Sequence, residues 1–235
     1  MSKNNYNIEV LKDDPGEIDL SFKIIVIGDP GVGKSCLSLK ATRDYFEPIY
    51  SPTIGFEFTV FFIKINDLFI KLQIWDTCGQ EAYRSIIKSF YRNSSLAILV
   101  CSIENKESFQ NLGLWLNEIR TEGNPDINIF LIGNKVDLVD KREVTKEMAQ
   151  SFMNNNHIKL FLETSAKTGF NTKNVFIEAG RLLYDQHMEY KNRISRPQSL
   201  ANLLENNNEE NNNIKILDDE DDDNNNNKRR KKCCK

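Results

Sequence analysis

The sequence predicts an α/β fold: a doubly wound, mostly parallel sheet of six strands, with one antiparallel edge strand and helices on both faces. Short apolar runs alternate along the chain with segments of helical periodicity, which is the order that parallel βαβ units require. A glycine-rich turn separates the first apolar run from the helix after it. One pair of strand-like runs is joined by only two residues, which predicts a hairpin and therefore an antiparallel strand.

The elements are predicted from periodicity and from turn residues. A buried strand is expected at residues 24–27, followed by a helix that includes Leu37 and Ala41. A loop at 45–55 leads into hairpin strands at 56–65 and 68–75, joined by Asn66 and Asp67. A loop and a short helix follow, through Tyr91. The later strands are expected at 96–100, 127–132 and 159–162, and the later helices at 107–120, 145–154 and 171–190.

One folded domain is expected at residues 21–190. The chain has 235 residues, which suits a single domain of ordinary size with extensions. Residues 1–20 are polar and show no periodicity, so they are predicted to be a flexible leader. Residues 191–235 contain asparagine runs and the acidic run 218–223. Such a composition buries too little apolar surface to offset the entropy of ordering, so this tail is predicted to be disordered.

Composition argues against several classes of protein. The formal net charge of −3 provides no overall basic field for nucleic acid. Cys36, Cys78 and Cys101 lie in predicted core elements, as buried thiols do in a reducing compartment. The first 20 residues resemble no signal peptide, and no apolar run reaches the roughly 20 residues that span a bilayer. We therefore expect a cytosolic protein unless a membrane anchor is attached.

The segment between the first strand and the first helix fits a phosphate-binding loop. Residues 28–35 read Gly-Asp-Pro-Gly-Val-Gly-Lys-Ser, which matches the pattern G-x-x-x-x-G-K-[ST]. The glycines let backbone N–H groups turn toward a phosphate, and the start of the helix adds positive potential. Lys34 can reach the β- and γ-phosphates, and the Ser35 hydroxyl can ligate Mg²⁺.

Four further polar stretches follow predicted strands or precede the hairpin. They are Thr53 in the loop, residues 75–81 (Trp-Asp-Thr-Cys-Gly-Gln-Glu), residues 134–137 (Asn-Lys-Val-Asp) and residues 163–167 (Glu-Thr-Ser-Ala-Lys). Each stretch alone is a common polar loop. Because ligands of doubly wound sheets bind at the carboxyl ends of the strands, the five stretches together predict one nucleotide site.

These five stretches resemble the Ras superfamily of small GTPases over residues 21–190, and most closely the Rab group. The Rab resemblance rests on residues 53–55, the Trp75-Asp76-Thr77 and Gly79-Gln80-Glu81 triplets, residues 90–92, and the terminal Cys233-Cys234 pair. It implies the phosphate-loop small GTPase fold. It also implies a switch that binds GTP or GDP with Mg²⁺, hydrolyses GTP to GDP and phosphate, and regulates vesicle and membrane traffic through state-dependent effector binding.

The resemblance assigns a role to each matching residue. An Asp137 carboxylate accepts both guanine donors, N1–H and the 2-amino group, which adenine does not offer. Ser35 and Thr53 would ligate Mg²⁺ directly, Asp76 would hold it through water, and Gln80 would orient the attacking water. The implied nucleotide-binding residues are Asp29, Gly31, Val32, Gly33, Lys34, Ser35, Cys36, Phe46, Tyr50, Thr53, Gly79, Asn134, Lys135, Asp137, Ser165, Ala166 and Lys167. Among these, the backbone N–H of Ala166 would meet the guanine O6.

The resemblance also implies partners and a location. Phe58, Trp75 and Phe90 match an aromatic trio that contacts effectors, although Phe90 stands where the group has tyrosine. Cys233 and Cys234 match a double geranylgeranyl signal on the cytoplasmic face of a membrane, with a soluble cytosolic pool. The resemblance implies a monomer whose protein partners are an exchange factor, a GTPase-activating protein, a GDP-dissociation inhibitor and effectors. No nucleic-acid partner is expected.

Three alternatives remain open. Pro30 stands where the family usually has glycine or serine, which leaves room for a GTP-binding module that hydrolyses little. Cys101-Ser102 and Asn93-Ser94 also depart from Rab usage, so a Ras-superfamily GTPase outside the Rab group is the second alternative. An ATP-using phosphate-loop kinase is the third, and Asp137 argues against it.

Overall fold

The computed structural model describes residues 6–48, 53, 55–78 and 90–194. The chain divides into a compact unit of residues 1–189 and a second unit of residues 190–235. The fold presented here is that of the first unit. In the second unit, only the helical residues 190–194 are described.

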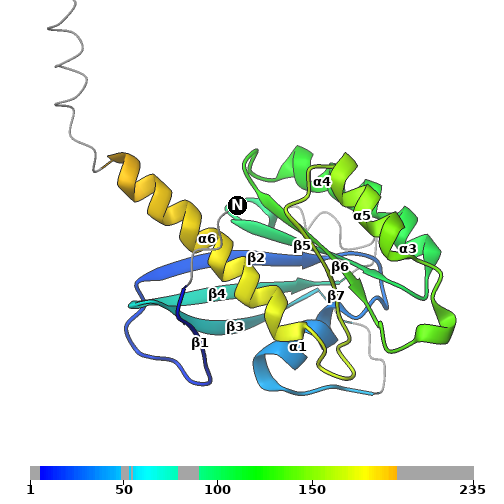
Figure 1. The fold of residues 1–235 in the computed structure, drawn as a ribbon, viewed down its shortest axis with the longest axis horizontal. Helices are drawn as coiled ribbons and strands as arrows, with labels where there is room; N and C mark the ends of the chain where they lie inside the picture. The colour runs from blue at the N-terminus through cyan, green and yellow to red at the C-terminus, as the bar shows by residue number, and fades with distance from the viewer. Residues whose placement is uncertain (1–5, 49–52, 54, 79–89, 195–235) are drawn as a thin grey trace, which may run out of the picture. The chain divides into compact units, whose positions relative to one another are not determined.

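The described strands form one seven-stranded sheet in the order β1-β3-β4-β2-β5-β6-β7 (Figure 1). Four of the strand pairings are parallel: β2 pairs with β4 and β5, β5 with β6, and β6 with β7. The two antiparallel pairings are β1 with β3 and β3 with β4, so β3 runs opposite to the other described strands. The strand bounds are β1 Ile8–Leu11, β2 Leu20–Ile27, β3 Phe56–Ile65, β4 Leu68–Thr77, β5 Leu96–Ser102, β6 Asn128–Asn134 and β7 Leu160–Glu163. The predicted doubly wound, mostly parallel α/β fold is therefore confirmed.

Helices cover both faces of the sheet. The α-helices are α1 Lys34–Arg43, α3 Lys106–Gln110, α4 Leu112–Glu122, α5 Lys146–Asn155 and α6 Thr172–Ile194, with a 3-10 turn at Val139–Lys141. One core contains residues of α1 and α6, and the other contains residues of α4 and α5. None of the described helices is long and apolar enough to span a membrane.

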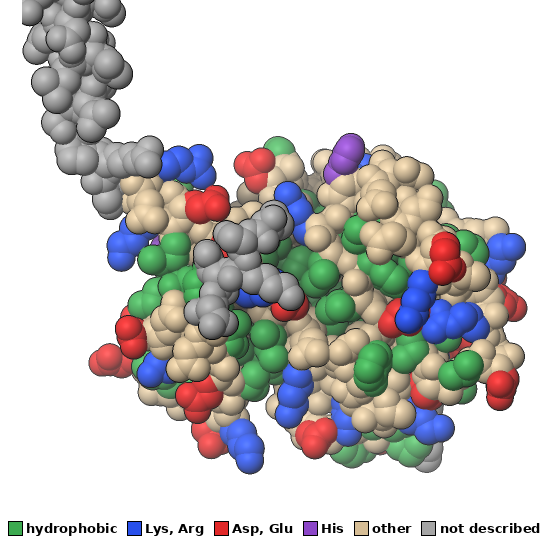
Figure 2. Space-filling model, in the orientation of Figure 1, with side chains coloured by type: hydrophobic (Ala, Val, Ile, Leu, Met, Phe, Trp, Pro, Cys, Tyr) green, Lys and Arg blue, Asp and Glu red, His purple; other side chains and the backbone are tan. Residues whose placement is uncertain are grey.

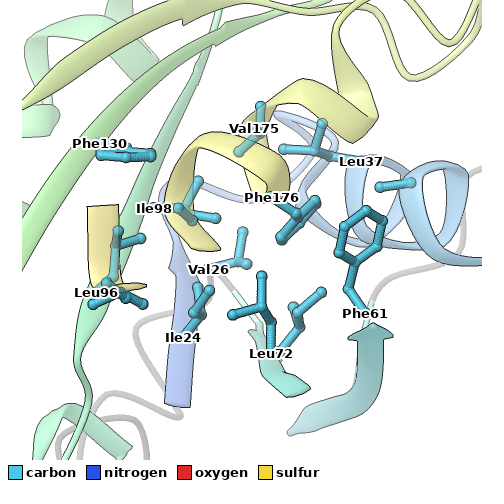
Figure 3. Packing of buried hydrophobic residues seen from close by; sticks show 14 of the residues in the cluster. Ile24, Val26, Leu37, Phe61, Leu72, Leu96, Ile98, Phe130, Val175 and Phe176 are labelled. Atoms are coloured by element: carbon cyan, nitrogen blue, oxygen red, sulfur yellow. The ribbon is translucent and has the colours of Figure 1, made fainter. Parts of the chain in front are cut away.

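Alternation along β2 explains the two cores. Ile24 and Val26 point into the core beneath α1 and α6, whereas Ile25 and Ile27 point into the other. All four side chains are fully buried. Figure 3 shows the first core, where Val175 and Phe176 of α6 lie above β2 and near Leu37 of α1. An apolar run without polar alternation, such as residues 24–27, predicts a strand that is buried on both faces.

The N-terminal segment corrects the sequence analysis, which expected a flexible leader at residues 1–20. Residues 8–11 form β1, which pairs with β3 between Ile8 and Ile65 and between Leu11 and Phe62. The Tyr6 ring meets the Tyr184 ring of α6 edge-on, with centroids 5.4 Å apart. The sequence analysis predicted β3 as the edge strand of the sheet. An edge strand has unpaired backbone N–H and C=O groups, and here β1 forms hydrogen bonds with those of β3. The sheet consequently has seven described strands with two antiparallel pairings, where the sequence predicted six strands with one antiparallel edge strand.

A second correction concerns the helix predicted at residues 107–120. The structure divides it into α3 and α4 at Asn111, whose backbone φ and ψ are −71° and −11°. The Asn105 side chain caps α3 by accepting a hydrogen bond from the Ser108 N–H at 2.9 Å. The start of α4 matters for the functional site, because Asn111 and Trp115 donate hydrogen bonds to Asp29 of the phosphate-loop segment.

Candidate functional site

The loop between β2 and α1 holds two glycines that no other residue could replace without movement. Gly28 has φ +141°, and a Cβ there would lie 2.2 Å from the carbonyl oxygen of Val100. Gly33 has φ +95°, and its Cβ would lie 2.4 Å from Nδ2 of Asn134. The loop is thus pressed against the ends of β5 and β6, at the carboxyl edge of the sheet.

Lys34 is a buried cation held by neutral groups. Its side chain is 5% exposed. Its Nζ donates hydrogen bonds to the carbonyl oxygens of Gly28 and Asp29, both at 2.9 Å. Burial lowers the pKa of Lys34, and the charges of Asp76 and Asp29 oppose that shift. A buried ammonium that faces a glycine-rich loop is suited to neutralise phosphate charge.

Ser35, Thr53 and Asp76 come together beside Lys34. The hydroxyl oxygens of Ser35 and Thr53 are 2.8 Å apart, and the Ser35 hydroxyl also donates to Oδ2 of Asp76. Asp76 is 1% exposed, and its Oδ1 has no hydrogen-bond partner within the described ranges. Burial raises the pKa of Asp76 to about 7, against the hydrogen bond from Ser35 and the charge of Lys34.

This donor set fits a divalent cation. Two hydroxyls and a carboxylate are hard oxygen ligands of the kind that Mg²⁺ prefers. A buried carboxylate oxygen without a partner is costly, and a metal ion or its bound water would satisfy it. A cavity of about 290 Å³ adjoins the set; its lining includes Ser35 and Asp76 and also Ser38, Leu39, Arg43, Glu57, Phe58 and Thr59. The residues predicted for Mg²⁺ are therefore near one another.

The opposite end of the site is a closed hydrogen-bond network around Asn134. The Asn134 Nδ2 donates to the carbonyl oxygen of Val32 at 2.9 Å, which ties β6 to the phosphate-loop segment. Its Oδ1 accepts from the Thr164 hydroxyl at 3.0 Å and from the Ala166 N–H at 3.3 Å. Asn134 is 1% exposed and Thr164 is fully buried. The N–H of Ala166, which was expected to meet guanine, donates to Asn134 here.

Asp137 is oriented by Ser165, which lies beside the Thr164 and Ala166 of the Asn134 network. Its Oδ1 accepts a hydrogen bond from the Ser165 hydroxyl at 2.6 Å, and Ser165 Oγ accepts one from the Thr168 N–H at 3.1 Å. Ser165 is fully buried, whereas Asp137 is half-buried. Lys135 pairs with Glu104, with Nζ and Oε1 2.7 Å apart. Glu104 was missed by sequence reasoning, because a glutamate after a strand carries no distinguishing signal.

Other predicted nucleotide-binding residues have less definite surroundings. Cys36 and Phe46 are half-buried, and Lys167 is exposed. Burial and the charge of Asp76 raise the pKa of the Cys36 thiol. Cys78 and Cys101 are buried free thiols, as predicted, whereas Cys36, for which burial was also predicted, is only half-buried. Five predicted residues lie outside the described part of the chain: Tyr50, Gly79, Gln80, Cys233 and Cys234.

The predicted aromatic trio is part of a cluster of four rings, called here the aromatic cluster: Phe56, Phe58, Trp75 and Phe90. The Trp75 ring centroid lies 5.1 Å from Phe58, 5.0 Å from Phe90 and 5.4 Å from Phe56. Phe56 and Phe58 are 44% and 47% exposed, so neither is a core residue. Phe56 was not predicted, since the alternation along residues 56–65 was ambiguous.

The aromatic cluster shares a strand with the metal-type donors. Trp75 and Asp76 are neighbours in β4, with side chains on opposite faces of the sheet. Phe58 is directly opposite Trp75 in β3, and the Cys78 N–H donates to the carbonyl oxygen of Gly55 at 3.0 Å. Across the face in Figure 2, basic and acidic side chains are interspersed, with hydrophobic side chains between them.

The geometry agrees with one comparison to known proteins. The model of the Ras family matches residues 23–185, which is well over half of the 235 residues. The match runs from β2 into α6 and includes the phosphate-loop segment, the Asp76 donor set and the Asn134 network. Ras-family proteins are in general guanine-nucleotide-binding switches that hydrolyse GTP. This chain belongs to the Ras family of small GTPases.

Proposed function

We propose that this protein is a Rab-type GTPase that is anchored to a membrane and regulates vesicle traffic through state-dependent effector binding. The observation that carries the proposal is the position of the aromatic cluster, in which Phe56 and Phe58 are about half exposed. Its Trp75 is on β4, the strand that also carries Asp76 of the Ser35, Thr53 and Asp76 donor set. Because Trp75 and Asp76 are adjacent, a change at the metal end of the site acts on the strand that carries the recognition surface.

The chemistry of hydrolysis follows from positioning rather than from a strong base. Lys34 and the loop N–H groups neutralise phosphate charge. Ser35 and Thr53 would hold Mg²⁺ directly and Asp76 would hold it through water; the bound ion supplies Lewis-acid stabilisation of the phosphate oxygens. Gln80 would orient a water molecule in line with the γ-phosphorus. The products are GDP and inorganic phosphate.

Base selection belongs to the Asn134 network. Asp137 accepts the N1–H and 2-amino donors of guanine, and Ser165 holds its carboxylate in place. Asn134 braces the phosphate-loop segment and the Ala166 backbone at once. The ligand proposed for this site is therefore GTP or GDP with Mg²⁺.

Switching and membrane attachment complete the proposal. Contacts of Thr53 and Gly79 with the γ-phosphate would order the neighbouring loops, and hydrolysis would release them. Cys233 and Cys234, after the basic run 228–232, would carry two geranylgeranyl groups. A protein anchored in this way works on the cytoplasmic face of a membrane, with an exchange factor, a GTPase-activating protein, a GDP-dissociation inhibitor and effectors as partners.

Two measurements test the proposal. In a single-turnover assay, Gln80→Leu is expected to keep GTP bound and to slow hydrolysis strongly; equal rates for variant and wild type would remove Gln80 from the mechanism.

In cells, the full chain with an N-terminal tag is expected in the membrane fraction, and the Cys233→Ser/Cys234→Ser variant in the soluble fraction. Membrane attachment of that variant would contradict lipid anchoring.

A second candidate is a GTP-binding module with little hydrolysis. Pro30 is exposed within the phosphate-loop segment and favours this candidate, because proline there changes the surface that an activating protein would approach. The same single-turnover assay separates the two functions. Wild-type hydrolysis no faster than that of GTP in buffer without protein would favour the binding module.

A further inference from the structure

Asp29 connects the phosphate-loop segment to α4 through both of its carboxylate oxygens. Oδ1 accepts a hydrogen bond from Nε1 of Trp115 at 2.7 Å, and Oδ2 accepts one from Nδ2 of Asn111 at 2.7 Å. Hydrogen bonds of this length to a carboxylate are charge-assisted and stronger than neutral ones. The pattern for phosphate-binding loops allows any residue at this position, so the motif itself does not require an aspartate.

The two donors differ in their surroundings. Trp115 is 2% exposed and packs in the core beneath α4. Asn111 lies at the break between α3 and α4, and its side chain makes no cap hydrogen bond to α4. One donor from the core and one from the start of α4, each bound to a different oxygen, hold the carboxylate in a single orientation.

The backbone of the same residue acts on the site. The carbonyl oxygen of Asp29 accepts one of the two described hydrogen bonds from Lys34 Nζ, at 2.9 Å, and that of Gly28 accepts the other. A rotation of the Asp29 peptide would therefore withdraw an acceptor from Lys34 and redirect the loop.

We propose that Asp29, Asn111 and Trp115 form a clamp that positions the phosphate-loop segment and slows nucleotide release. The inference rests on the proposed binding of nucleotide at this loop. Asp29 acts through the backbone and through Lys34, so the three members are positioning residues. Because α4 supplies Trp115, the clamp also makes the rate of nucleotide release depend on the position of α4.

The test measures dissociation of fluorescent GDP from the full chain. Trp115→Phe removes the indole donor, Asn111→Ala removes the amide donor, and Asp29→Ala removes the acceptor. Trp115→Phe and Asn111→Ala are each expected to release GDP about tenfold faster, the effect of losing roughly one charge-assisted hydrogen bond. Asp29→Ala loses both hydrogen bonds, so its release is expected to be about 100-fold faster. Asp29→Ala combined with Trp115→Phe is expected to be no faster than Asp29→Ala, because both changes remove the same interaction.

Tyr184→Phe is the matched control, since it also removes one polar group from a buried aromatic side chain. Tyr184 is 6% exposed, and its hydroxyl accepts a hydrogen bond from Asn66 at 3.2 Å on the other face of the sheet. This control is expected to lower the melting temperature and to leave the GDP release rate within about twofold of wild type. Asp29→Asn retains one acceptor oxygen and is expected to restore an intermediate rate.

A spectroscopic readout separates positioning from a loss of stability. The chain has two tryptophans, so the Trp115 indole N–H is one of two such signals in a proton–nitrogen NMR spectrum. Asp29→Ala should shift that signal and Tyr184→Phe should not. A shifted signal with an unchanged release rate would overturn the clamp, as would additive rates in the double variant. Failure of the wild type to bind GDP would instead overturn the proposed function, and the clamp with it.

Discussion

The two ends of the candidate site differ in whether their buried polar groups have partners within the protein. At the base end, the Asn134 amide, the Thr164 hydroxyl and the Ser165 hydroxyl all have hydrogen-bond partners within the protein. At the phosphate end, Asp76 keeps a buried oxygen without a partner in the described residues, and its pKa is raised to about 7. Lys34, also buried, has a lowered pKa.

The difference indicates that folding builds the base end and that the ligand completes the phosphate end. A hydrogen-bond network whose buried groups all have partners stabilises the folded state by itself. Buried charges without full compensation cost stability until a ligand supplies the opposite charge. Binding of a phosphate and a metal ion is expected to offset this unfavourable free energy. The phosphate end is therefore the part of the site whose stability depends on ligand.

The largest effect on this comparison is expected from Asp76→Asn. The neutral amide removes the cost of burying a carboxylate, so the melting temperature of the nucleotide-free protein in EDTA at pH 8 should rise. The slowing of GDP release by Mg²⁺ should weaken by about 10–100-fold, the range observed when an outer ligand of a metal is removed. Thermal unfolding and fluorescent-GDP dissociation measure the two effects. A fall in the melting temperature would show that the phosphate end is stable without ligand.

At the base end, Asp137→Asn changes selectivity. The variant amide accepts only one guanine donor, so the affinity for GTP should fall by about 10–100-fold, from roughly 1.5–3 kcal/mol for a hydrogen bond to a charged group. XTP, which has a carbonyl in place of the 2-amino group, should gain relative affinity. Competition between GTP and XTP provides the measurement. If GTP displaces XTP from the variant as strongly as from the wild type, Asp137 does not select the base.

The pH dependence of the phosphate end provides the next test. Because the folded protein raises the pKa of Asp76 to about 7, the folded state binds a proton that the unfolded chain loses near pH 4. Stability of the nucleotide-free protein should therefore fall as pH rises from about 4 to 7. Affinity for Mg²⁺ should change in the opposite direction, by about tenfold per pH unit below 7, because only the carboxylate binds the ion.

Unfolding by urea and Mg²⁺ titration, each across pH 5–8, measure these two trends. The Asp76→Asn variant is the control, since it should show neither contribution. Parallel trends in stability and Mg²⁺ affinity would contradict the assignment of the titrating group to Asp76.

The smallest expected effect is that of Thr164→Val. The substitution conserves volume and removes one neutral donor to Asn134, which also accepts from Ala166. The free energy of unfolding should decrease by about 1 kcal/mol, equally with and without nucleotide, because the network forms on folding. Urea unfolding in both states measures it. An effect confined to the nucleotide-bound protein would show that the base end also depends on ligand.

Much of the fold and of the site follows from local patterns. The apolar run at 24–27, the glycine-rich loop and the helix after it are adjacent in the sequence, so periodicity and turn chemistry predict them together. Ser35, Thr53 and Asp76 were assigned from motif order, and the structure brings them into contact. Asp137 and Ser165 were likewise predicted in one site and share a hydrogen bond.

Other features depend on which surfaces meet. The helix predicted at 107–120 is broken at Asn111, although its apolar positions have continuous helical spacing. Phe56 contacts Trp75 and Phe90 only because the hairpin and Phe90 lie together in the folded protein. No pattern in the sequence pairs Glu104 with Lys135 or Asp29 with Trp115, since each pair joins residues far apart in the chain.

The sequence by itself therefore determined the class of fold, the order of the elements and the chemical groups of the candidate nucleotide site. These depend on periodicity, turn residues and motif spacing, which are local. Only the tertiary structure decided that residues 8–11 form β1, that α3 and α4 separate, and that Asp29 faces α4. The physical reason is distance along the chain: Tyr6 donates a hydrogen bond to Asp185 across 179 positions, and such a contact exists only after the sheet and α6 have packed together.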